Sequence, residues 1–354
     1  MRVLCGPGTV LVDEHGFTLR IHCAGDAHCL RVVALEDDMI RVSLLRKCKR
    51  VVERTWMVSP GAPDVPDEGF AKDSFQGFAG PAVAIDTVPD GTLSLSTKRM
   101  RCTVNTCAHA PLALQFDWWS DEAGAWLPLL HDRRTGAYYL SRRGDGLAHF
   151  TRRQRGDRIF GCGEVSGELD RVGRRFVMSA TDAMGYDAQS SDPLYKFWPS
   201  YVAKPAGESS AAFGVLYDSM AKCTLDFGCE MDNYHGLFHT YSAEQGDLDY
   251  IVVLGPSVLQ ATRRLSWLTG QSIMPPRWSL GYSGSTMTYT DAPDAQIQLL
   301  SFLTLCREHR VSGRVRVMVS PPATPLLPHP LPRAPGSTGA PAAPPAALVF
   351  TTDD

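Results

Sequence analysis

The sequence lacks the features that would assign it to several large classes of protein. No run of about 18 apolar residues occurs, so we expect no membrane-spanning helix and no membrane partner. The first residues contain no sustained apolar segment, so no export signal is expected and the cytoplasm is the expected location. A net charge of −3, with 21% charged residues, offers no basic excess for nucleic acid.

Metal-ligand spacings and cysteine pairs are also scarce. The ten cysteines are scattered and none forms a Cys-X-X-Cys motif, so we interpret them all as free thiols. His235 and His239 are four residues apart, but the intervening Gly236 and aromatic residues fit a strand or loop better than a metal-binding helix. Two surface histidines are the preferred interpretation, and no metal ligands and no cofactor are predicted.

Short strands dominate what the chain does contain. From about Val10 to Leu254, apolar or alternating runs rich in β-branched and aromatic residues are broken by Gly, Pro, Asp and Asn. Such runs occupy residues 39–45, 82–85, 92–96, 100–104, 211–217 and 248–254, and Pro89-Asp90-Gly91 is a predicted turn. So many strands without helical periodicity predict a mainly β chain that opens with a large antiparallel β-sandwich.

The pattern becomes helical after Pro256. An apolar stripe runs from Val258 to Leu268, with Ser257 placed to cap the helix and Gly270 to end it. A short strand follows Pro275, and then a second helix is predicted from Asp291, as its capping residue, to His309. A strand, a loop and a helix in this order predict the first unit of a (β/α)₈ barrel.

The last segment has a different composition. Residues 321–345 are rich in proline and alanine and carry Arg333 as their one formally charged side chain, so burial cannot repay the entropy of ordering them. The resulting domain prediction is a sandwich at 1–255, a linker helix at 256–274, the start of a truncated catalytic barrel at 275–311, and a disordered low-complexity tail at 312–354.

A glycine-rich stretch, Gly161 to Gly167, invites a comparison with phosphate-binding loops. Its third glycine falls one place late for Gly-X-Gly-X-X-Gly and no βαβ pattern follows, so nucleotide binding is not predicted. More specific motifs come next. They are residues 167–176 (GELDRVGRRF), 181–187 (TDAMGYD), 191–199 (SDPLYKFWP), 244–250 (EQGDLDY) and 275–282 (PPRWSLGY).

These motifs, in this order and spacing, resemble glycoside hydrolase family 31, the family of α-glucosidases and α-xylosidases. The resemblance covers roughly residues 30 to 311. It implies a galactose-mutarotase-like sandwich before a (β/α)₈ barrel, and retaining hydrolysis of α-linked glucosides by two carboxyl groups about 5 to 5.5 Å apart. In the family both carboxyls are aspartates that follow later barrel strands, so no catalytic residue is expected here and the polypeptide is expected to be inactive.

The resemblance leaves one edge of the sugar site in this chain. Asp182 matches an aspartate that hydrogen-bonds a substrate sugar, a task suited to a carboxylate that accepts from two hydroxyls. The alternative is that Asp182 only stabilises a turn. Met287 matches a position lining the sugar pocket, and Tyr186 and Asp187 are further substrate-binding candidates. An α-linked glucoside or oligosaccharide, bound weakly if at all, is the expected partner.

Two other functions stay open from the sequence. One is a stand-alone carbohydrate-binding β-sandwich module, and the other is a regulatory fragment without catalysis. The sequence leaves the oligomeric state undetermined.

Overall fold

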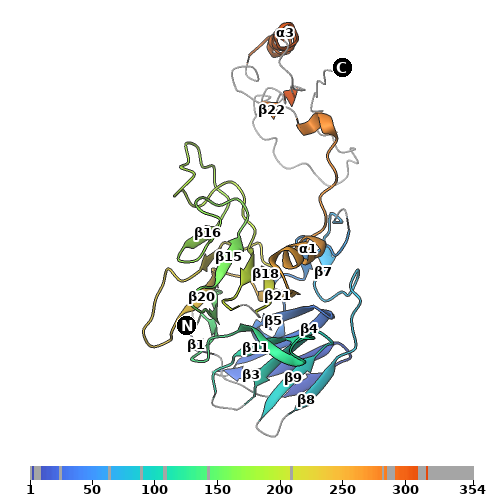
Figure 1. Cartoon of the computed structure of the whole chain (residues 1–354), viewed down its shortest axis with the longest axis vertical. Coiled ribbons are helices and arrows are strands. Elements are labelled where there is room, and N and C mark those ends of the chain that lie inside the picture. Colours follow the sequence, from blue (N-terminus) through green and yellow to red (C-terminus); the bar gives the residue numbers. More distant parts are fainter. Residues whose placement is uncertain are drawn as a thin grey trace, which may run out of the picture. The chain divides into compact units, whose positions relative to one another are not determined.

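The computed structural model describes residues 2–3, 9–23, 26–62, 65–87, 91–106, 110–141, 144–207, 210–280, 283–284, 292–309 and 316–317. The chain divides into two compact units, Met1–Gln271 and Ser272–Asp354. Figure 1 shows the β-rich first unit, coloured from blue to orange along the chain.

Three large antiparallel sheets and the two-stranded antiparallel sheet of β6 (Arg54–Thr55) and β7 (Phe70–Ala71) build the first unit. An eight-stranded sheet contains, in spatial order, β15 (Arg158–Gly161), β17 (Ser200–Lys204), β18 (Ala212–Tyr217), β21 (Leu248–Gly255), β5 (Met39–Leu45), β4 (Asp26–Glu36), β3 (Gly16–Cys23) and β2 (Val10–Val12). A six-stranded sheet contains β1 (Arg2–Val3), β13 (Tyr138–Leu140), β14 (Leu147–Arg152), β20 (Phe238–Ala243), β19 (Cys223–Asp226) and β16 (Arg175–Met178). A five-stranded sheet contains β12 (Ala125–His131), β11 (Leu114–Ser120), β10 (Met100–Asn105), β9 (Thr92–Ser96) and β8 (Ala84–Thr87). The predicted mainly β, antiparallel sandwich is confirmed.

The main core lies between one face of the eight-stranded sheet and the other two sheets. Alternate residues of β5 and β21, such as Val42 and Val252, point into it. Their neighbours, including Met39 and Val253, point to the opposite face and pack with Val58 and other residues of a second cluster. Both faces of β21 are therefore covered, which explains why every residue from Leu248 to Gly255 is buried although the sheet is antiparallel.

Helix α1 (Val258–Leu268) covers part of that second face. Ser257 and Gln260 form a reciprocal capping box at its start, and Gly270 adopts a positive φ of 84° just beyond its end. Ala261 and Leu268 are its buried residues, and Ala261 packs with Val202 and Ala212 of the sheet. The predicted cap and stop are confirmed, and the helix forms part of the first unit.

Two of the cysteines are bonded, which corrects the interpretation of all ten as free thiols. Cys29 in β4 and Cys48 form a disulfide, with their Cα atoms 4.7 Å apart. β4 and β5 are antiparallel neighbours with Cys29 opposite Leu45, and the short 3₁₀ helix Arg46–Cys48 turns the chain back toward β4. This proximity depends on strand register, so spacing along the sequence did not indicate it.

A cluster of buried ions ties the second face together. Arg41 in β5 donates from Nε and Nη2 to the two carboxylate oxygens of Asp249 in β21, both at 2.8 Å, and from Nη2 to Asp218 at 2.5 Å. Lys72 lies 3.4 Å from Asp249, and Arg50 lies 2.9 Å from it. Burial alone would raise the pKa of Asp249, but the charges of Arg41, Lys72 and Arg50 lower it well below its usual range.

The cluster also fixes the segment that covers it. Thr55 in β6 (Arg54–Thr55) donates to Asp218 at 2.6 Å, and Lys72, which follows β7 (Phe70–Ala71), donates to the Asp218 carbonyl at 2.6 Å. Residues 50–73 are thereby joined to the end of β18.

The second unit contains η2 (Arg277–Leu280), β22 (Ser283–Gly284), α3 (Ala295–Glu308) and β23 (Arg316–Val317). β22 and β23 pair in parallel, with α3 between them along the chain. The N-cap of α3 is Asp294, so the start predicted at Asp291 was wrong. Pro293 explains the shift, because it disfavours helical backbone at the residue before it. The barrel and the tail stay predictions. Met287, the turn at residues 89–90 and most of the tail lie outside the described residues. Among the described helices, neither α1 nor α3 has the length and apolarity needed to cross a membrane.

Replacing Arg41 tests whether the ion cluster holds the fold. Arg41→Met leaves two buried aspartates with less compensation and should lower the free energy of unfolding by about 3 to 5 kcal/mol. Urea unfolding measures this loss. Lys222→Met is the control, because it breaks a pair with Glu244 whose side chains are 54% and 70% exposed, and should cost no more than about 1 kcal/mol. Equal losses in the two variants would contradict a central role for the cluster.

Candidate functional site

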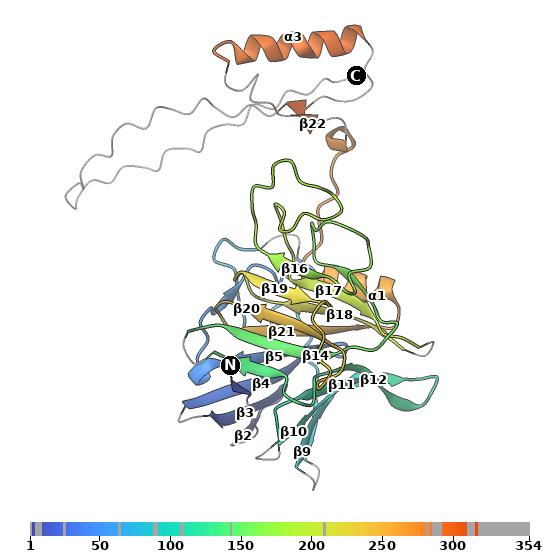
Figure 2. The ribbon, with the colours of Figure 1, turned by 90° about the vertical axis from the view of Figure 1, so that its left-hand side faces the viewer.

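Two long loops at one end of the sandwich contain most of the residues predicted to contact sugar. The first, residues 162–174, connects β15 to β16, and the second, residues 179–199, connects β16 to β17. Figure 2 shows both loops projecting beyond the sheets above β16 and β17. The Gly167 amide donates to the Ala188 carbonyl at 2.8 Å, so the loops are joined to each other.

Two arginines fix the base of the loops. Arg171 is buried and donates to the carbonyls of Gly161 and Ser166 at 3.3 and 3.2 Å. Arg174 donates to the Ser166 carbonyl at 2.6 Å and lies over the Phe176 ring at 4.8 Å from its centroid. Arginine suits this task because one guanidinium can serve several carbonyls.

Gly163 and Gly167 are required here by close contacts rather than by a phosphate. A Cβ on Gly163 would lie 1.9 Å from Cε3 of Trp198, and one on Gly167 would lie 1.6 Å from Nη1 of Arg174. Both have positive φ, 76° and 86°. The glycine-rich stretch is thus where the second loop packs onto the first.

Asp182 lies exposed on the second loop, beside an exposed pair of tyrosines. Partial desolvation, and next the negative charge of Asp182, raise the pKa of the Tyr195 hydroxyl, with smaller contributions from Tyr186 and Glu164. The Thr181 amide donates to the Leu194 carbonyl at 3.0 Å, so the outgoing and returning segments of the loop lie side by side at this point. We call Glu164, Asp182, Tyr186 and Tyr195 the rim cluster.

Glu164 was not predicted as a site residue. It belongs to the glycine-rich stretch that the sequence marks as a loop, but its proximity to Tyr195 depends on how the two loops meet. Exposed Asp182, half-buried Glu164 and the two exposed phenol hydroxyls can together accept and donate hydrogen bonds to several sugar hydroxyls. The rim cluster contains no positive charge that would favour an anionic ligand.

Asp187 is used by its own loop. Its Oδ1 accepts from the amides of Gln189 and Ser190 at 2.8 and 2.9 Å, and its own amide donates to the Ser191 hydroxyl at 2.8 Å. The bonds from Gln189 and then Ser190 lower the pKa of Asp187. Asp192 is likewise structural, since Oδ2 accepts from the Val177 amide at 2.7 Å.

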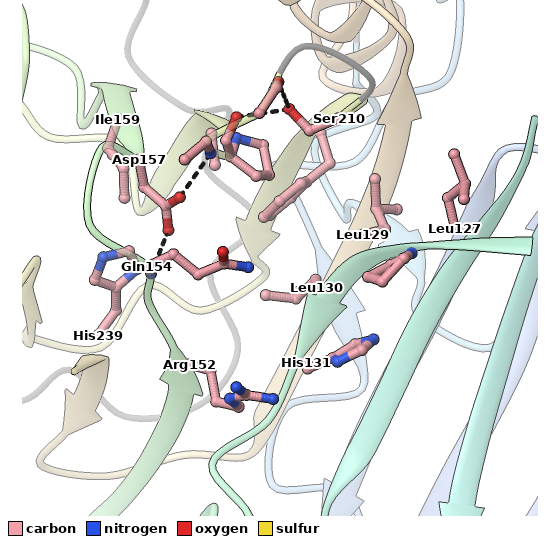
Figure 3. Close-up of a pocket in the computed structure, with 16 residues that line it drawn as sticks. Leu127, Leu129, Leu130, His131, Arg152, Gln154, Asp157, Ile159, Ser210 and His239 are labelled. Carbon is pink, nitrogen blue, oxygen red and sulfur yellow. Dashed lines mark hydrogen bonds between the residues drawn. The ribbon is translucent and has the colours of Figure 1, made fainter. Parts of the chain in front are cut away.

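A second candidate region is a cavity of about 410 Å³ between β12, β14 and the β15 and β17 edge. Figure 3 shows His239 and Gln154 on one side of it and His131 and the β12 leucines on the other. The two carboxylate oxygens of Asp157 accept from the amides of Gln154 and Ala206. The Ser210 hydroxyl donates to the Gly207 carbonyl within its own turn. Desolvation, and then the charge of Arg153, lower the pKa of His239 to about 3, so it is neutral near pH 7. His239 is only 8% exposed, so its interpretation as a surface histidine was wrong, and its buried Nε2 has no hydrogen-bond partner among the described residues.

An acid, an imidazole and a hydroxyl also meet in the sandwich core. Asp132 lies 2.9 Å from His149 Nε2, and Tyr217 lies 3.1 Å from His149 Nδ1. His149 stacks between Tyr138 and Tyr250 with centroids 4.8 Å away on each side. All three side chains are buried. Their hydrogen bonds therefore satisfy polar groups within the core, and none of the three faces a substrate.

Two glycines with similar backbone conformation test the contact at the base of the rim. Gly163→Ala should be the more destabilising because it adds the collision with Trp198 to the strain of positive φ. Gly173→Ala is the matched control, since its φ is 81° and nothing lies within 4 Å of the added Cβ. The two losses in free energy of unfolding should differ by about 1 to 3 kcal/mol, measured by urea unfolding and by proteolysis of the loops. The same loss in both variants would show that Trp198 yields without cost.

Comparison with known proteins assigns the family. Residues 29–226, more than half of the chain, match the model of the glycosyl hydrolase 31 N-terminal galactose mutarotase-like domain. Alpha-glucosidase 2 of Bacillus thermoamyloliquefaciens is 35% identical over 133 residues, 38% of this chain and 16% of that protein. An alpha-glucosidase of Saccharolobus solfataricus is 32% identical over 133 residues, 38% of this chain and 18% of that one. The matches therefore span less than a fifth of these relatives.

Solved structures agree at the level of the fold. A family 31 dextranase of Flavobacterium johnsoniae, in complex with isomaltotriose, superimposes with a TM-score of 0.69 at 19% identity, covering 90% of this chain and 34% of the dextranase. This chain belongs to glycoside hydrolase family 31, and its residues 29–226 are the N-terminal galactose mutarotase-like domain of that family.

Proposed function

We propose that this chain contributes the sandwich and one edge of the substrate site to retaining hydrolysis of α-linked glucosides. The observation that carries the proposal is the rim cluster, in which Asp182 lies exposed beside Tyr195 on a loop that the family resemblance assigns to the sugar site. The α-glucosidases and α-xylosidases among the relatives support an α-linked substrate. A dextranase with bound isomaltotriose supports a glucose-containing oligosaccharide.

The rim cluster suits sugar binding and not bond cleavage. Retaining cleavage needs one carboxylate as nucleophile and a second carboxyl as acid and base, on opposite sides of the glycosidic bond. Asp182 is instead an exposed carboxylate beside the Tyr195 hydroxyl, where it can accept from neighbouring hydroxyls. We also propose that the 354-residue polypeptide on its own does not hydrolyse glycosides. A further part of the proposal is that Met287 lines the sugar pocket.

No observation favours the sandwich as a free-standing binding module or a regulatory fragment over a part of a glycosidase. The family match, and the fold shared with a much longer family 31 dextranase, fit a part of a glycosidase.

An activity assay tests the catalytic part of the proposal. The purified 354-residue protein should release no nitrophenol from a nitrophenyl α-glucoside above the buffer rate, because the family resemblance places the nucleophile and the acid/base after later barrel strands and gives the rim residues neither role. Alpha-glucosidase 2 under the same conditions is the positive control. Turnover that survives repurification and is abolished by Asp182→Asn would contradict the proposal and place catalysis at the rim.

Fluorine NMR of fluorotyrosine-labelled protein tests the role of Asp182. Adding maltose should shift the signals of Tyr195 and Tyr186, which Tyr→Phe variants identify. Asp182→Asn should weaken the response roughly tenfold, because a charge-assisted hydrogen bond contributes about 1.5 to 3 kcal/mol.

Asp170→Asn is a matched control carboxylate from the first loop, where Asp170 bonds the Ile159 and Val172 amides. Its titration should equal that of the unaltered protein once folding is verified. Tyr195 and Tyr186 signals that ignore maltose, or that respond equally in the Asp182→Asn variant, would rule out a sugar contact at Asp182.

A further inference from the structure

A second hollow, of about 400 Å³, lies on the outer face of the eight-stranded sheet. Most of its lining comes from residues 51–56, the turn after β18 at 218–221 and the turn before β21 at 245–247, and Arg46, Lys72 and Asp145 complete it. The turn before β21 belongs to the motif at 244–250, for which the rim offers no role. The volume falls within the range of small-molecule sites.

Trp56 presents a fixed aromatic surface at this hollow. Its Nε1 donates to the Asp67 carbonyl at 3.0 Å, which sets the orientation of the ring. A Cβ on Gly69 would lie 2.9 Å from Trp56 Cε2, so the indole packs directly on the Gly69 backbone. The residue is nevertheless 48% exposed. A large apolar surface held in place and left open to solvent is typical of a binding site.

One acceptor and one donor at the hollow have no partner among the described residues. Asp247 is 5% exposed; its Oδ2 accepts from the Val51 amide at 2.8 Å, while its buried Oδ1 accepts from nothing. Arg46 donates from Nη2 to the carbonyls of Asp145 and Gly146 at 2.9 and 2.6 Å, while its buried Nε donates to nothing. Unpaired buried groups of this kind cost about 1 to 3 kcal/mol each. Both atoms are closed to solvent, so the polar groups that a ligand meets are the exposed side chains of Arg54, Asp145 and Gln245.

The charges at the hollow favour a neutral ligand. Three basic residues, Arg46, Arg54 and Lys72, line it together with three acidic residues, Asp145, Asp218 and Asp247. The formal charges cancel, so neither an anion nor a cation gains from the site as a whole.

The floor of the hollow is rigid. Asp218 and Lys72 belong to the buried ion cluster. Thr55, the residue before Trp56, donates to Asp218 at 2.6 Å. A site whose walls are already ordered loses little entropy when a ligand binds.

We propose that this hollow is a second carbohydrate-binding site, which takes a neutral hexopyranose unit. The apolar face of the sugar ring packs on the Trp56 indole, and ring hydroxyls bond to the exposed polar side chains of Arg54, Asp145 and Gln245. The site shares no residue with the rim cluster, so it stands independently of the proposed function. It would hold an oligosaccharide to the sandwich at a place distinct from the one at which Asp182 binds it.

Fluorine NMR of fluorotryptophan-labelled protein tests the site. The chain has seven tryptophans, and Trp56→Phe identifies the signal of Trp56. Titration with maltotriose should shift that signal saturably, while Trp198 on the rim loop reports separately on sugar bound at the rim. The shift should persist in Asp182→Asn, which separates this site from the rim.

Two variants probe the hydrogen bonds. Asp145→Asn removes the charge of an exposed carboxylate at the hollow and should weaken maltotriose binding roughly tenfold. Gln245→Ala removes an exposed amide at the same hollow and should weaken binding severalfold. Tyr234→Ala removes an aromatic residue that is 94% exposed and outside the hollow, and should leave binding unchanged.

Three results would overturn the proposal. One is a Trp56 signal that does not move up to the solubility limit of the sugar. Another is a shift of Trp198 alone, which would place the sugar at the rim. The third is a Trp56 signal that depends on protein concentration without sugar, which would show that a second copy of the chain covers the hollow.

Discussion

The buried ion cluster around Asp249 is the constraint on which much of this domain depends. Arg41 and Asp249 are 208 residues apart in the sequence, and their two hydrogen bonds exist only when β5 and β21 are neighbours in the correct register. Isolated charges in a protein interior are strongly unfavourable, so each member of the cluster requires the others. Strand order, the covering segment at residues 50–73 and the end of β18 are therefore coupled through one set of contacts.

That coupling has consequences at the surface. The same Asp218 and Lys72 that complete the cluster also form the floor of the hollow beside Trp56. The rim loops have a different support, in which Arg171 and Arg174 bind loop carbonyls and Trp198 packs on Gly163. Both regions thus place exposed aromatic and polar groups on a base that is already ordered, an arrangement suited to binding flexible polar ligands.

Much of the fold could be predicted from local patterns, because strand periodicity and turn residues are properties of neighbouring positions. The predicted runs at residues 39–45 and 248–254 are β5 and β21, and Ser257 and Gly270 mark the ends of α1. The disulfide between Cys29 and Cys48 was missed because it depends on the turn after β5. The start of α3 was placed too early because Asp291 and Asp294 are both plausible caps in sequence.

The candidate site divides in the same way. The sequence alone determined the antiparallel β-sandwich and the loop containing Asp182, and its motifs were sufficient to indicate the family, since these features depend on residue types in a fixed order. Only the tertiary structure decided that Glu164 and Tyr195 lie near Asp182, that Asp187 serves its own turn, and that Trp56 and Gln245 line one hollow. Those relations join segments distant along the chain, and strand register and loop packing set them.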